Sequence, residues 1–251
     1  MIDLARLETY CNGLLSVQSF QDYCPNGLQV DAGNDRIERI VSGVTACQAL
    51  IDAALEVEAD LLLVHHGYFW KNEAAALVGA KGRRVRSLIG GGINLLAYHL
   101  PLDAHRELGN NRQLALRLGM QDAEPLSEDD GLLWHAELDE VQTARQLSGR
   151  IGEVLDREPL HIAGGAEGIR RIGWCTGAAQ SYIERAAAAG LDAFISGEVS
   201  EATTHLAREL DIHYFAAGHH ATERFGVQAL GQHLAEYFGL EHRYIEVPNP
   251  V

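Results

Sequence analysis

Three short stretches of the sequence bring imidazole and carboxylate side chains close together along the chain. They are the pair His65-His66, His99 with Asp103, and His219 with Glu223. Imidazole nitrogens and carboxylate oxygens in combination suit zinc, manganese, iron, cobalt or nickel, and they suit calcium poorly. The residue types therefore indicate metal chemistry before any element of structure is assigned.

The adjacency of His65 and His66 indicates how many metals to expect. Neighbouring residues of an extended strand point to opposite sides, so one metal cannot easily bind both imidazoles, whereas two neighbouring metals can take one each. A carboxylate can bridge two cations through its two oxygens, which suits ions roughly 3.5–4 Å apart. We therefore predict two divalent ions per chain, held by His65, His66, Asp103, His219 and Glu223.

Three further polar residues lie close in sequence to these ligands. They are Glu198, His99 and His220. Such side chains can orient a ligand imidazole or carry protons during a reaction, and these are the catalytic residues that we predict. The alternative for each of them is an ordinary surface or hydrogen-bonded residue.

Other catalytic chemistries lack their motifs in this chain. The sequence has no Gly-x-Ser-x-Gly nucleophile elbow, no Gly-x-x-x-x-Gly-Lys phosphate loop, and no Gly-x-Gly-x-x-Gly after a strand. The cysteines are scattered and include no Cys-x-x-Cys pair, so we predict buried reduced thiols rather than a zinc knuckle or a disulfide framework.

Apolar runs place the polar stretches at the ends of strands. Leu61–Val64 is four aliphatic residues in a row, which is typical of a buried parallel strand. The pattern predicts a strand over 37–44, a helix over 47–57 and a strand over 60–64, and the next strand runs into His99. Because open α/β sheets bind ligands beyond the carboxyl ends of their strands, we expect the site at that edge.

The last polar stretch coincides with the start of a predicted helix. His219 and Glu223 are four residues apart, a spacing that places an imidazole and a carboxylate on one helical face. After this helix the chain is expected to close with a short strand over 244–247.

The second half of the chain repeats the first at a fixed offset of 132 residues (172 − 40). The pairs at this offset include Ile40 with Ile172, Arg39 with Arg171, and Asp60 with Asp192. One offset held without a gap across strand, helix and strand indicates two related βαβ halves. In this alignment Ser196-Gly197-Glu198 occupies the place of Val64-His65-His66.

The character of the sequence changes near residue 125, where we place a domain boundary. Residues 1–124 would form a first α/β half carrying His65, His66 and Asp103, and residues 125–251 a second half carrying His219 and Glu223. Within the second half, residues 125–165 would be an inserted βαβ segment. This segment either packs with the second half or lies over the site as a lid.

Composition restricts the class of protein. At 251 residues, 47% hydrophobic and 22% charged, the chain is typical of a globular protein with room for two domains. The formal net charge of −15 disfavours nucleic acid as a partner. No apolar run is long enough to span a bilayer, and the first residues lack the order of a signal peptide, so we expect a cytoplasmic protein without membrane contact.

Four separated motifs together resemble a known family. They are His65-His66-Gly67-Tyr68-Phe69-Trp70-Lys71, His99-Leu100-Pro101-Leu102-Asp103, Ser196-Gly197-Glu198 and Gly218-His219-His220-Ala221-Thr222-Glu223. In this order they resemble the family named for NGG-one-interacting factor three, whose bacterial members are labelled GTP cyclohydrolase I type-two homologs. One departure is Gly67, where many members have proline, and this change loosens the backbone beside the ligands.

The resemblance implies a fold of two interlinked α/β domains with a dinuclear metal site in the cleft between them. It also implies assembly into ring-shaped homohexamers. Carried over residue by residue, the family's ligands fall on the same five positions, with Asp103 and Glu223 as the bridges.

The family label implies hydrolytic opening of the guanine ring of GTP, and hence a small-molecule substrate such as a nucleotide. Two metals would lower the pKa of a bridging water to near neutrality, and the resulting hydroxide would attack an electrophilic carbon or phosphorus. A basic run after Lys71 comprises Lys81, Arg83, Arg84 and Arg86. This run would either hold a phosphate or form a solvated helix face, and its pattern favours the solvated face. The alternative is a non-catalytic metal-binding scaffold or sensor that assembles as a ring.

Overall fold

The computed structural model describes residues 1–127 and 131–251 and divides the chain into two compact units. Unit 1 comprises Met1–Leu102 and Gly226–Pro248, and unit 2 comprises Asp103–Phe225 and Asn249–Val251. Because the chain enters unit 2 after Leu102 and returns to unit 1 after Phe225, the two α/β units are interlinked, as the resemblance implied. This division differs from the boundary expected near residue 125, and it assigns Asp103 to the second unit.

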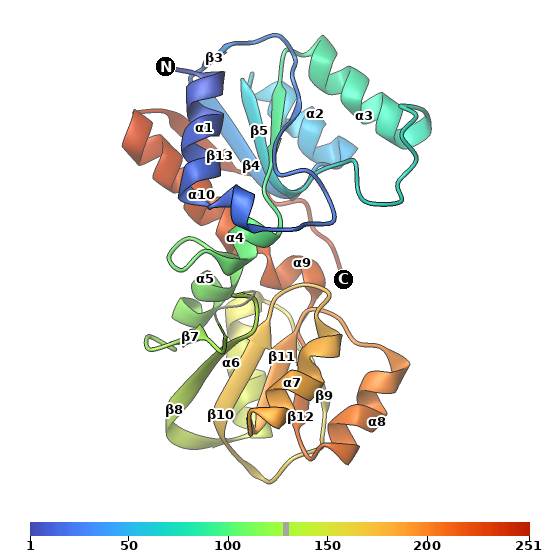
Figure 1. Ribbon diagram of the computed structural model, residues 1–251, viewed down its shortest axis with the longest axis vertical. Coiled ribbons are helices and arrows are strands. Elements are labelled where there is room, and N and C mark those ends of the chain that lie inside the picture. Colours follow the sequence, from blue (N-terminus) through green and yellow to red (C-terminus); the bar gives the residue numbers. More distant parts are fainter. Residues whose placement is uncertain (128–130) are drawn as a thin grey trace. The chain divides into compact units, whose positions relative to one another are not determined.

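Unit 1 is built on a five-stranded sheet in the order β13-β4-β5-β6-β2 (Figure 1). The strands are β2 (Gly27–Val30), β4 (Arg39–Thr45), β5 (Leu61–His66), β6 (Asn94–Ala97) and β13 (Glu241–Tyr244). The helices are α1 (Leu4–Leu14), α2 (Gln48–Glu56), α3 (Gly79–Gly90) and α10 (Arg224–Phe238), with one 3-10 turn, η1 (Val17–Ser19). Short strands β1 (Ile2–Asp3) and β3 (Arg36–Ile37) pair with each other.

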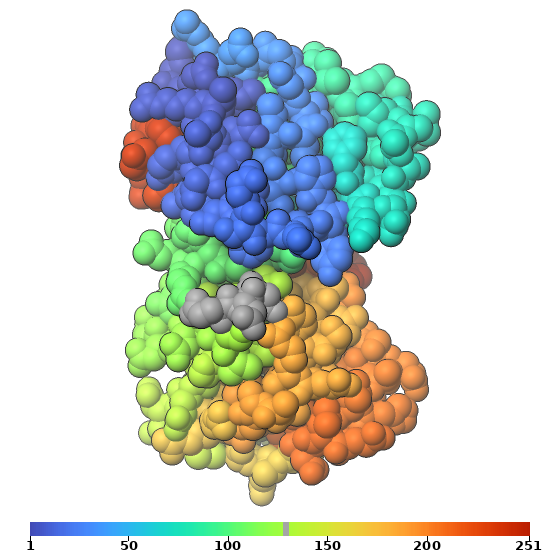
Figure 2. All heavy atoms as spheres, in the orientation of Figure 1, coloured from blue at the N-terminus to red at the C-terminus, as the bar shows by residue number. Residues whose placement is uncertain are grey.

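The central strands of unit 1 are parallel and buried, as their unbroken aliphatic runs predicted. Helices α2 and α3 cover one face of this sheet, where Leu50 and Val85 belong to the same apolar core as Leu62. Helices α1 and α10 lie beside one another away from α2 and α3, and their segments adjoin on the surface (Figures 1 and 2). Tyr10 stacks on Tyr237 there, with 4.6 Å between the ring centroids.

Unit 2 is built on a six-stranded sheet in the order β7-β8-β10-β11-β12-β9 (Figure 1). The strands are β7 (Glu124–Pro125), β8 (Trp134–Thr143), β9 (Leu160–Ile162), β10 (Gly168–Cys175), β11 (Ala193–Ser196) and β12 (His213–Ala216). The helices are α4 (Leu100–Ala104), which spans the boundary, α5 (Asn110–Arg117), α6 (Ala144–Leu155), α7 (Ile183–Ala188), α8 (Glu201–Glu209) and α9 (His219–Thr222), with one 3-10 turn, η2 (Gln180–Tyr182).

Helices cover both faces of the second sheet. Leu114 of α5 and Ile151 of α6 pack with Trp174 in one apolar core, while Ile183 of α7 packs with Phe194 in another. Helix α6 begins on a capping box, in which the Thr143 hydroxyl and the Gln146 side chain satisfy each other's backbone N–H groups.

The inserted segment expected over 125–165 forms β8, α6 and β9, which is a strand-helix-strand order. Strand β8 pairs antiparallel with β10, and β9 pairs antiparallel with β12. These two strands therefore extend the second sheet on either side of its parallel centre. These pairings agree with the alternative in which the segment packs with the second half, while its residues 128–130 lie outside the described residues.

Two expected elements differ from the structure. The helix expected to begin at His219 is broken, because α9 ends at Thr222 and α10 begins at Arg224. The last strand occupies Glu241–Tyr244 rather than 244–247, since it pairs in parallel with β4 at that register. The cysteines are reduced thiols and three of the four are buried, as predicted. Within the described ranges, no helix is both long and apolar enough to cross a membrane.

Candidate metal centre

The carboxyl end of the first sheet carries three histidines. His65 and His66 end strand β5, and His99 follows β6. One nitrogen of each ring lies within 4.8 Å of the others. The centroid of the His65 ring lies 4.6 Å from that of His66 and 5.1 Å from that of His99. Unit 1 therefore presents a histidine cluster at the edge of the sheet that the sequence indicated.

Each ring of this histidine cluster is held through its Nδ1 atom. His65 Nδ1 lies 2.9 Å from the carbonyl oxygen of Tyr98, and His66 Nδ1 lies 3.3 Å from the Thr45 hydroxyl. His99 Nδ1 lies 2.7 Å from a carboxylate oxygen of Asp22. Hydrogen bonds of this kind fix ring orientation in metal sites and make Nε2 the nitrogen that binds the metal.

Asp103, the first residue of unit 2, is buried and held by two neighbours in that unit. The Asn110 side-chain amide donates to Asp103 Oδ1 at 2.8 Å, and the Thr176 hydroxyl donates to the same oxygen at 3.3 Å. An oxygen of Asp103 and an oxygen of Glu223 lie within 4.8 Å of each other. Only 5% of Asp103 and 3% of Glu223 is exposed, so two acidic side chains are concentrated in a buried part of unit 2.

His219 lies between two carboxylates. Its Nδ1 is 2.7 Å from Glu198 Oε1, and its Nε2 is 3.1 Å from Glu223 Oε2. The turn at Gly177 leaves room for this arrangement, because a Cβ atom there would collide with the Glu223 carboxylate. Asp103, His219 and Glu223 thus form a carboxylate cluster in unit 2.

The charge around His219 sets its protonation state in the metal-free protein. Burial lowers the pKa of His219, but Glu223 and then Glu198 outweigh burial and raise this pKa to about 9. The ring therefore carries a proton near neutral pH when no metal is bound, and a metal at Nε2 would have to replace that proton.

The three predicted catalytic residues have different surroundings. His99 belongs to the histidine cluster, and Glu198 contacts His219. His220 is buried in α9, and its backbone N–H donates to the Val251 carbonyl at 2.9 Å. In the described part of the chain, His220 is outside the groups of side chains whose spacing could hold a metal.

Several residues around the clusters could not be found from motif spacing. Asp22 and Thr176 are far in sequence from the histidine and aspartate that they contact. Trp70 packs edge-on against His99, with 4.9 Å between ring centroids, and lies 5.8 Å from His66. The only sequence signal for Asp22 was its place before the Pro25-Asn26-Gly27 turn, a position at which acidic side chains often bond to backbone amides.

The glycine that departs from the family pattern makes room for another side chain. A Cβ atom at Gly67 would collide with the Gln29 amide and with Ala97. The Gln29 carbonyl oxygen accepts the backbone N–H of Tyr68 at 2.6 Å. Gln29 therefore fixes the backbone beyond the two histidines, where a looser chain was expected.

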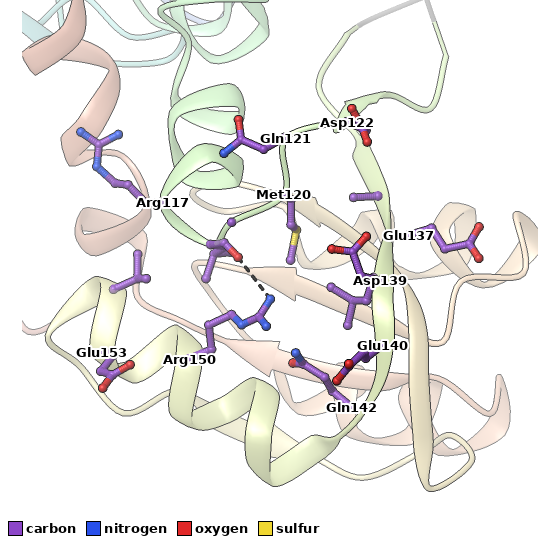
Figure 3. Close-up of a pocket in the computed structure, with 15 residues that line it drawn as sticks. Arg117, Met120, Gln121, Asp122, Glu137, Asp139, Glu140, Gln142, Arg150 and Glu153 are labelled. Atoms are coloured by element: carbon purple, nitrogen blue, oxygen red, sulfur yellow. Dashed lines mark hydrogen bonds between the residues drawn. The ribbon is translucent and has the colours of Figure 1, made fainter.

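A pocket elsewhere in unit 2 has no part in these clusters. Its volume is about 740 Å³, and it lies between β8 and the helices α5 and α6 (Figure 3). Its labelled acidic residues include Asp122, Glu137 and Asp139, and Arg150 donates to the Leu118 carbonyl at 3.2 Å. None of the predicted metal ligands lines it.

Comparison with known proteins identifies the family. The model of the Duf34/NIF3 (NGG1p interacting factor 3) family matches residues 2–250. The chain belongs to the Duf34/NIF3 family. A relative from Allochromatium vinosum named GTP cyclohydrolase 1 type 2 homolog is 54% identical over 250 residues, covering 100% of this chain and 98% of the relative. Another of the same name, from Vibrio cholerae, is 55% identical over 255 residues and covers 98% of each chain.

Solved structures agree with this membership of the Duf34/NIF3 family. The structure of the protein ybgI, described as of unknown function, has a TM-score of 0.95 and 46% sequence identity, with 100% of each chain covered. The resemblance read from four motifs is therefore confirmed, and so is the α/β fold class.

The side chains present fit divalent metal ions. Imidazoles held at Nδ1 and buried carboxylates are the usual ligands of zinc and its first-row neighbours, and a cation would offset the negative charge of Asp103 and Glu223. The structure therefore contains His, Asp and Glu clusters that could bind metal.

Proposed function

We propose that the histidine cluster of unit 1 and the carboxylate cluster of unit 2 bind the same two divalent metals, and that the protein is a metal-dependent hydrolase. The Nδ1 contacts of the three proposed histidine ligands, His65, His66 and His219, are the observation that carries this proposal, since they make Nε2 the nitrogen of each ring that can bind a metal. Chain connectivity supports a shared centre. His99 ends the unit 1 cluster only four residues before Asp103 opens unit 2.

The proposed ligands are His65, His66, Asp103, His219 and Glu223, with the two carboxylates as bridges. Metals at this place would supply Lewis acidity and lower the pKa of water toward neutrality. The protein's own groups then orient the ligands and handle protons. Glu198 and Asp22 fix imidazole orientation, while His99 and Trp70 would meet the substrate.

By family name, we propose a substrate of the GTP cyclohydrolase type, a nucleotide whose ring is opened by water. Exposed basic side chains at Lys71, Arg83 and Arg86 in unit 1 could bind its phosphates. Assembly into a homohexamer is part of the same proposal, and sedimentation velocity on the purified protein would give the molecular mass that tests it.

A metal-by-metal assay tests the function. Protein stripped of metal is reloaded with manganese, iron, zinc, cobalt or nickel and incubated with GTP, other nucleotides, phosphoesters and cyclic amides. We expect two metals per chain by elemental analysis and turnover that depends on loading. Glu223→Gln should lose one metal and all turnover, whereas substitution of an exposed acid on helix α10, Glu236→Gln, should keep both metals and the turnover.

The same assay separates the alternative function. Two bound metals with no turnover on any substrate class would contradict the hydrolase and favour a non-catalytic metal-binding scaffold or sensor. Full metal binding by Glu223→Gln would contradict the shared centre itself.

A further inference from the structure

Asp22 is a buried acidic side chain beside the histidine cluster, and both of its oxygens accept hydrogen bonds. Its Oδ1 accepts the backbone N–H of Tyr23 at 2.6 Å and contacts His99 Nδ1 at 2.7 Å. Its Oδ2 accepts the backbone N–H of Leu100 at 2.9 Å and the Asn26 side-chain amide at 2.9 Å. The side chain is only 3% exposed. An ionised carboxylate has no hydrogen to donate, so Asp22 accepts a hydrogen bond at each of these four contacts.

The partners of Asp22 also hold the backbone on which His99 stands. Asn26, which donates to Asp22, accepts the backbone N–H of His99 through its own oxygen at 2.7 Å. Two residues of the 22–26 turn therefore hold His99, Asp22 through the ring and Asn26 through the backbone N–H. Burial would raise the pKa of Asp22, but the hydrogen bonds from His99, Asn26 and Tyr23 lower it below its ordinary value, which keeps the carboxylate ionised.

An ionised carboxylate determines which nitrogen of a neutral His99 carries the proton. Two acceptors cannot share a 2.7 Å contact, so Nδ1 must be the protonated nitrogen and Nε2 must hold the lone pair. The His99 ring lies 5.1 Å from His65 and 5.7 Å from His66. Because Nδ1 is turned to Asp22, Nε2 is the nitrogen that serves the cluster.

We propose that Asp22 is a positioning residue that fixes the Nδ1–H tautomer of His99, so that His99 offers an acceptor nitrogen to a water or a substrate N–H beside the metal ligands. The use of this acceptor in hydrolysis rests on the proposed function, whereas the tautomer does not. Cys24 is also close to Asp22 and His99, and burial together with the charge of Asp22 raises its pKa to about 12, so it is a thiol in the metal-free protein.

Asp22→Asn is the informative substitution because an amide has one donor end. If its nitrogen took the place of Oδ2, it would face two donors, Leu100 N–H and the Asn26 amide. If it took the place of Oδ1, it would face one fixed donor, Tyr23 N–H, and would donate to His99 Nδ1. The second orientation is favoured, and it forces the opposite tautomer on His99, with the proton on Nε2.

The matched control is Asp60→Asn. Asp60 is an aspartate of unit 1, directly before strand β5, that also accepts from the backbone N–H groups of Glu38 and Arg39 and from the Asn34 side chain. It has no histidine among these partners. Both variants lose hydrogen bonds to an ionised carboxylate, so comparable losses of stability are expected, and only Asp22→Asn should change a histidine.

The test is the ¹⁵N NMR spectrum of histidine-labelled, metal-free protein, in which the shifts of the two ring nitrogens report the tautomer. The His99 signals are assigned by their loss in His99→Gln. We expect the Nδ1–H form in the natural protein, the Nε2–H form in Asp22→Asn, and no change in Asp60→Asn. An Nε2–H tautomer in the natural protein overturns the proposal without any variant having to fold.

Turnover in the metal-loaded protein provides a second readout. For Asp22→Asn we expect kcat to fall about 100-fold with KM and metal content nearly unchanged, because a misdirected acceptor costs about that much in well-positioned sites. A loss of the same size in Asp60→Asn would show a merely structural effect and overturn the positioning role. If no variant or natural protein turns over any substrate, the proposed function fails while the tautomer result still decides the inference.

Discussion

Strands β4 and β10 begin with the same arrangement of residues in the two units. In each, an aspartate directly before the second strand accepts backbone N–H groups from residues at or near the start of the first. The groups are Asp60 with Glu38 and Arg39 in unit 1, and Asp192 with Arg170 and Arg171 in unit 2, at distances of 2.7–2.9 Å. Every pair keeps the 132-residue offset found in the sequence.

The two crossover helices also end in the same way. Arg39 donates to the carbonyls of Val57 and Glu58, and at the same offset Arg171 donates to those of Ala189 and Gly190. The last of these positions has a left-handed backbone in both copies, with φ of 52° at Glu58 and 70° at Gly190. The equivalent contacts confirm that the two βαβ halves are related.

The copies differ where the second strand ends. In unit 1 the strand itself supplies His65 and His66. At the equivalent places unit 2 has Gly197 and Glu198, and a Cβ atom on Gly197 would lie 2.6 Å from His219 Cα. The glycine of the second copy leaves room for the segment that carries His219, and Glu198 contacts the Nδ1 atom of that ring. Related frameworks thus present their histidines on different segments, the strand end in unit 1 and helix α9 in unit 2.

The largest effect on stability is expected at Gly197, which occupies the position of His65 in the second copy and has no side chain. Gly197→Ala should lower the free energy of unfolding by about 3 kcal/mol, because the new methyl overlaps the backbone of His219 and of Gly177. Urea unfolding monitored by circular dichroism measures this. Gly13→Ala, in open space on α1, is the matched change and should be neutral or stabilising; equal losses in both variants would mean that Gly197 is not a packing requirement.

The shared aspartates should give the next largest effect. Asp60→Ala and Asp192→Ala each remove a carboxylate from two backbone donors, and each should cost about 1–3 kcal/mol of unfolding free energy. Asp60→Ala should cost more, since Asp60 also accepts from Asn34 at 3.0 Å. Chemical denaturation of the two variants side by side is the measurement. An unchanged free energy of unfolding in either variant would contradict the conclusion that the two aspartates have equivalent roles in the two units.

A smaller effect concerns His219, a proposed ligand in unit 2 that lies between the carboxylates of Glu198 and Glu223. Because the pKa of His219 is raised to about 9, its protonated ring stabilises the metal-free protein fully below about pH 6.5, and this contribution is lost as the pH rises through about 9. Metal affinity should therefore increase about 10-fold per pH unit below about 9. Calorimetric titration with zinc at several pH values measures this.

The control for this pH dependence is Glu198→Gln. Removal of one of the two flanking charges should lower the pKa of His219 and flatten the increase of affinity with pH. A dependence on pH that is the same in both proteins would exclude His219 as the group that loses the proton.

The smallest effect is expected at the outer strand of the first sheet. Burial lowers the pKa of His242, which contacts the Ser42 hydroxyl at 2.8 Å. Neutral His242 therefore contributes stability above its unfolded pKa of about 6.5, and this is lost as the pH falls through the depressed folded value. His242→Gln should show a weaker decline in urea midpoint between pH 7.5 and 5.5, and an unchanged decline would contradict the buried neutral ring.

Residue type and short-range spacing were enough to predict imidazole and carboxylate side chains that cluster, and the βαβ order. His65 and His66 could be predicted because an apolar strand leads into them, and the repeat because its offset is constant. Residues whose role depends on contacts with residues far away in the sequence could not be predicted from it. Asp22 contacts His99 from 77 positions away, and Thr176 contacts Asp103 from 73 positions away, so no local pattern records either pairing.

The division into units was also beyond the sequence pattern. The change of character near residue 125 marks an inserted segment, whereas the boundary between units falls at Leu102, inside the short helix α4. The return of residues 226–248 to unit 1 depends on pairing between β13 and β4, which are about 200 residues apart, and hydrophobic periodicity gives no information on such a partner.

That long-range pairing orders events during protein synthesis. Ribosomes add about 5–20 residues per second. Because β13 lies about 200 residues after β4, the edge of β4 stays unpaired for roughly 10–40 s before β13 is synthesised. The strands of unit 2 are complete in that interval, because they lie between residues 124 and 216. We expect the second unit to fold first on the ribosome, while the histidine-bearing unit stays open along β4 until its last strand is made, and protease protection of stalled nascent chains would reveal this order.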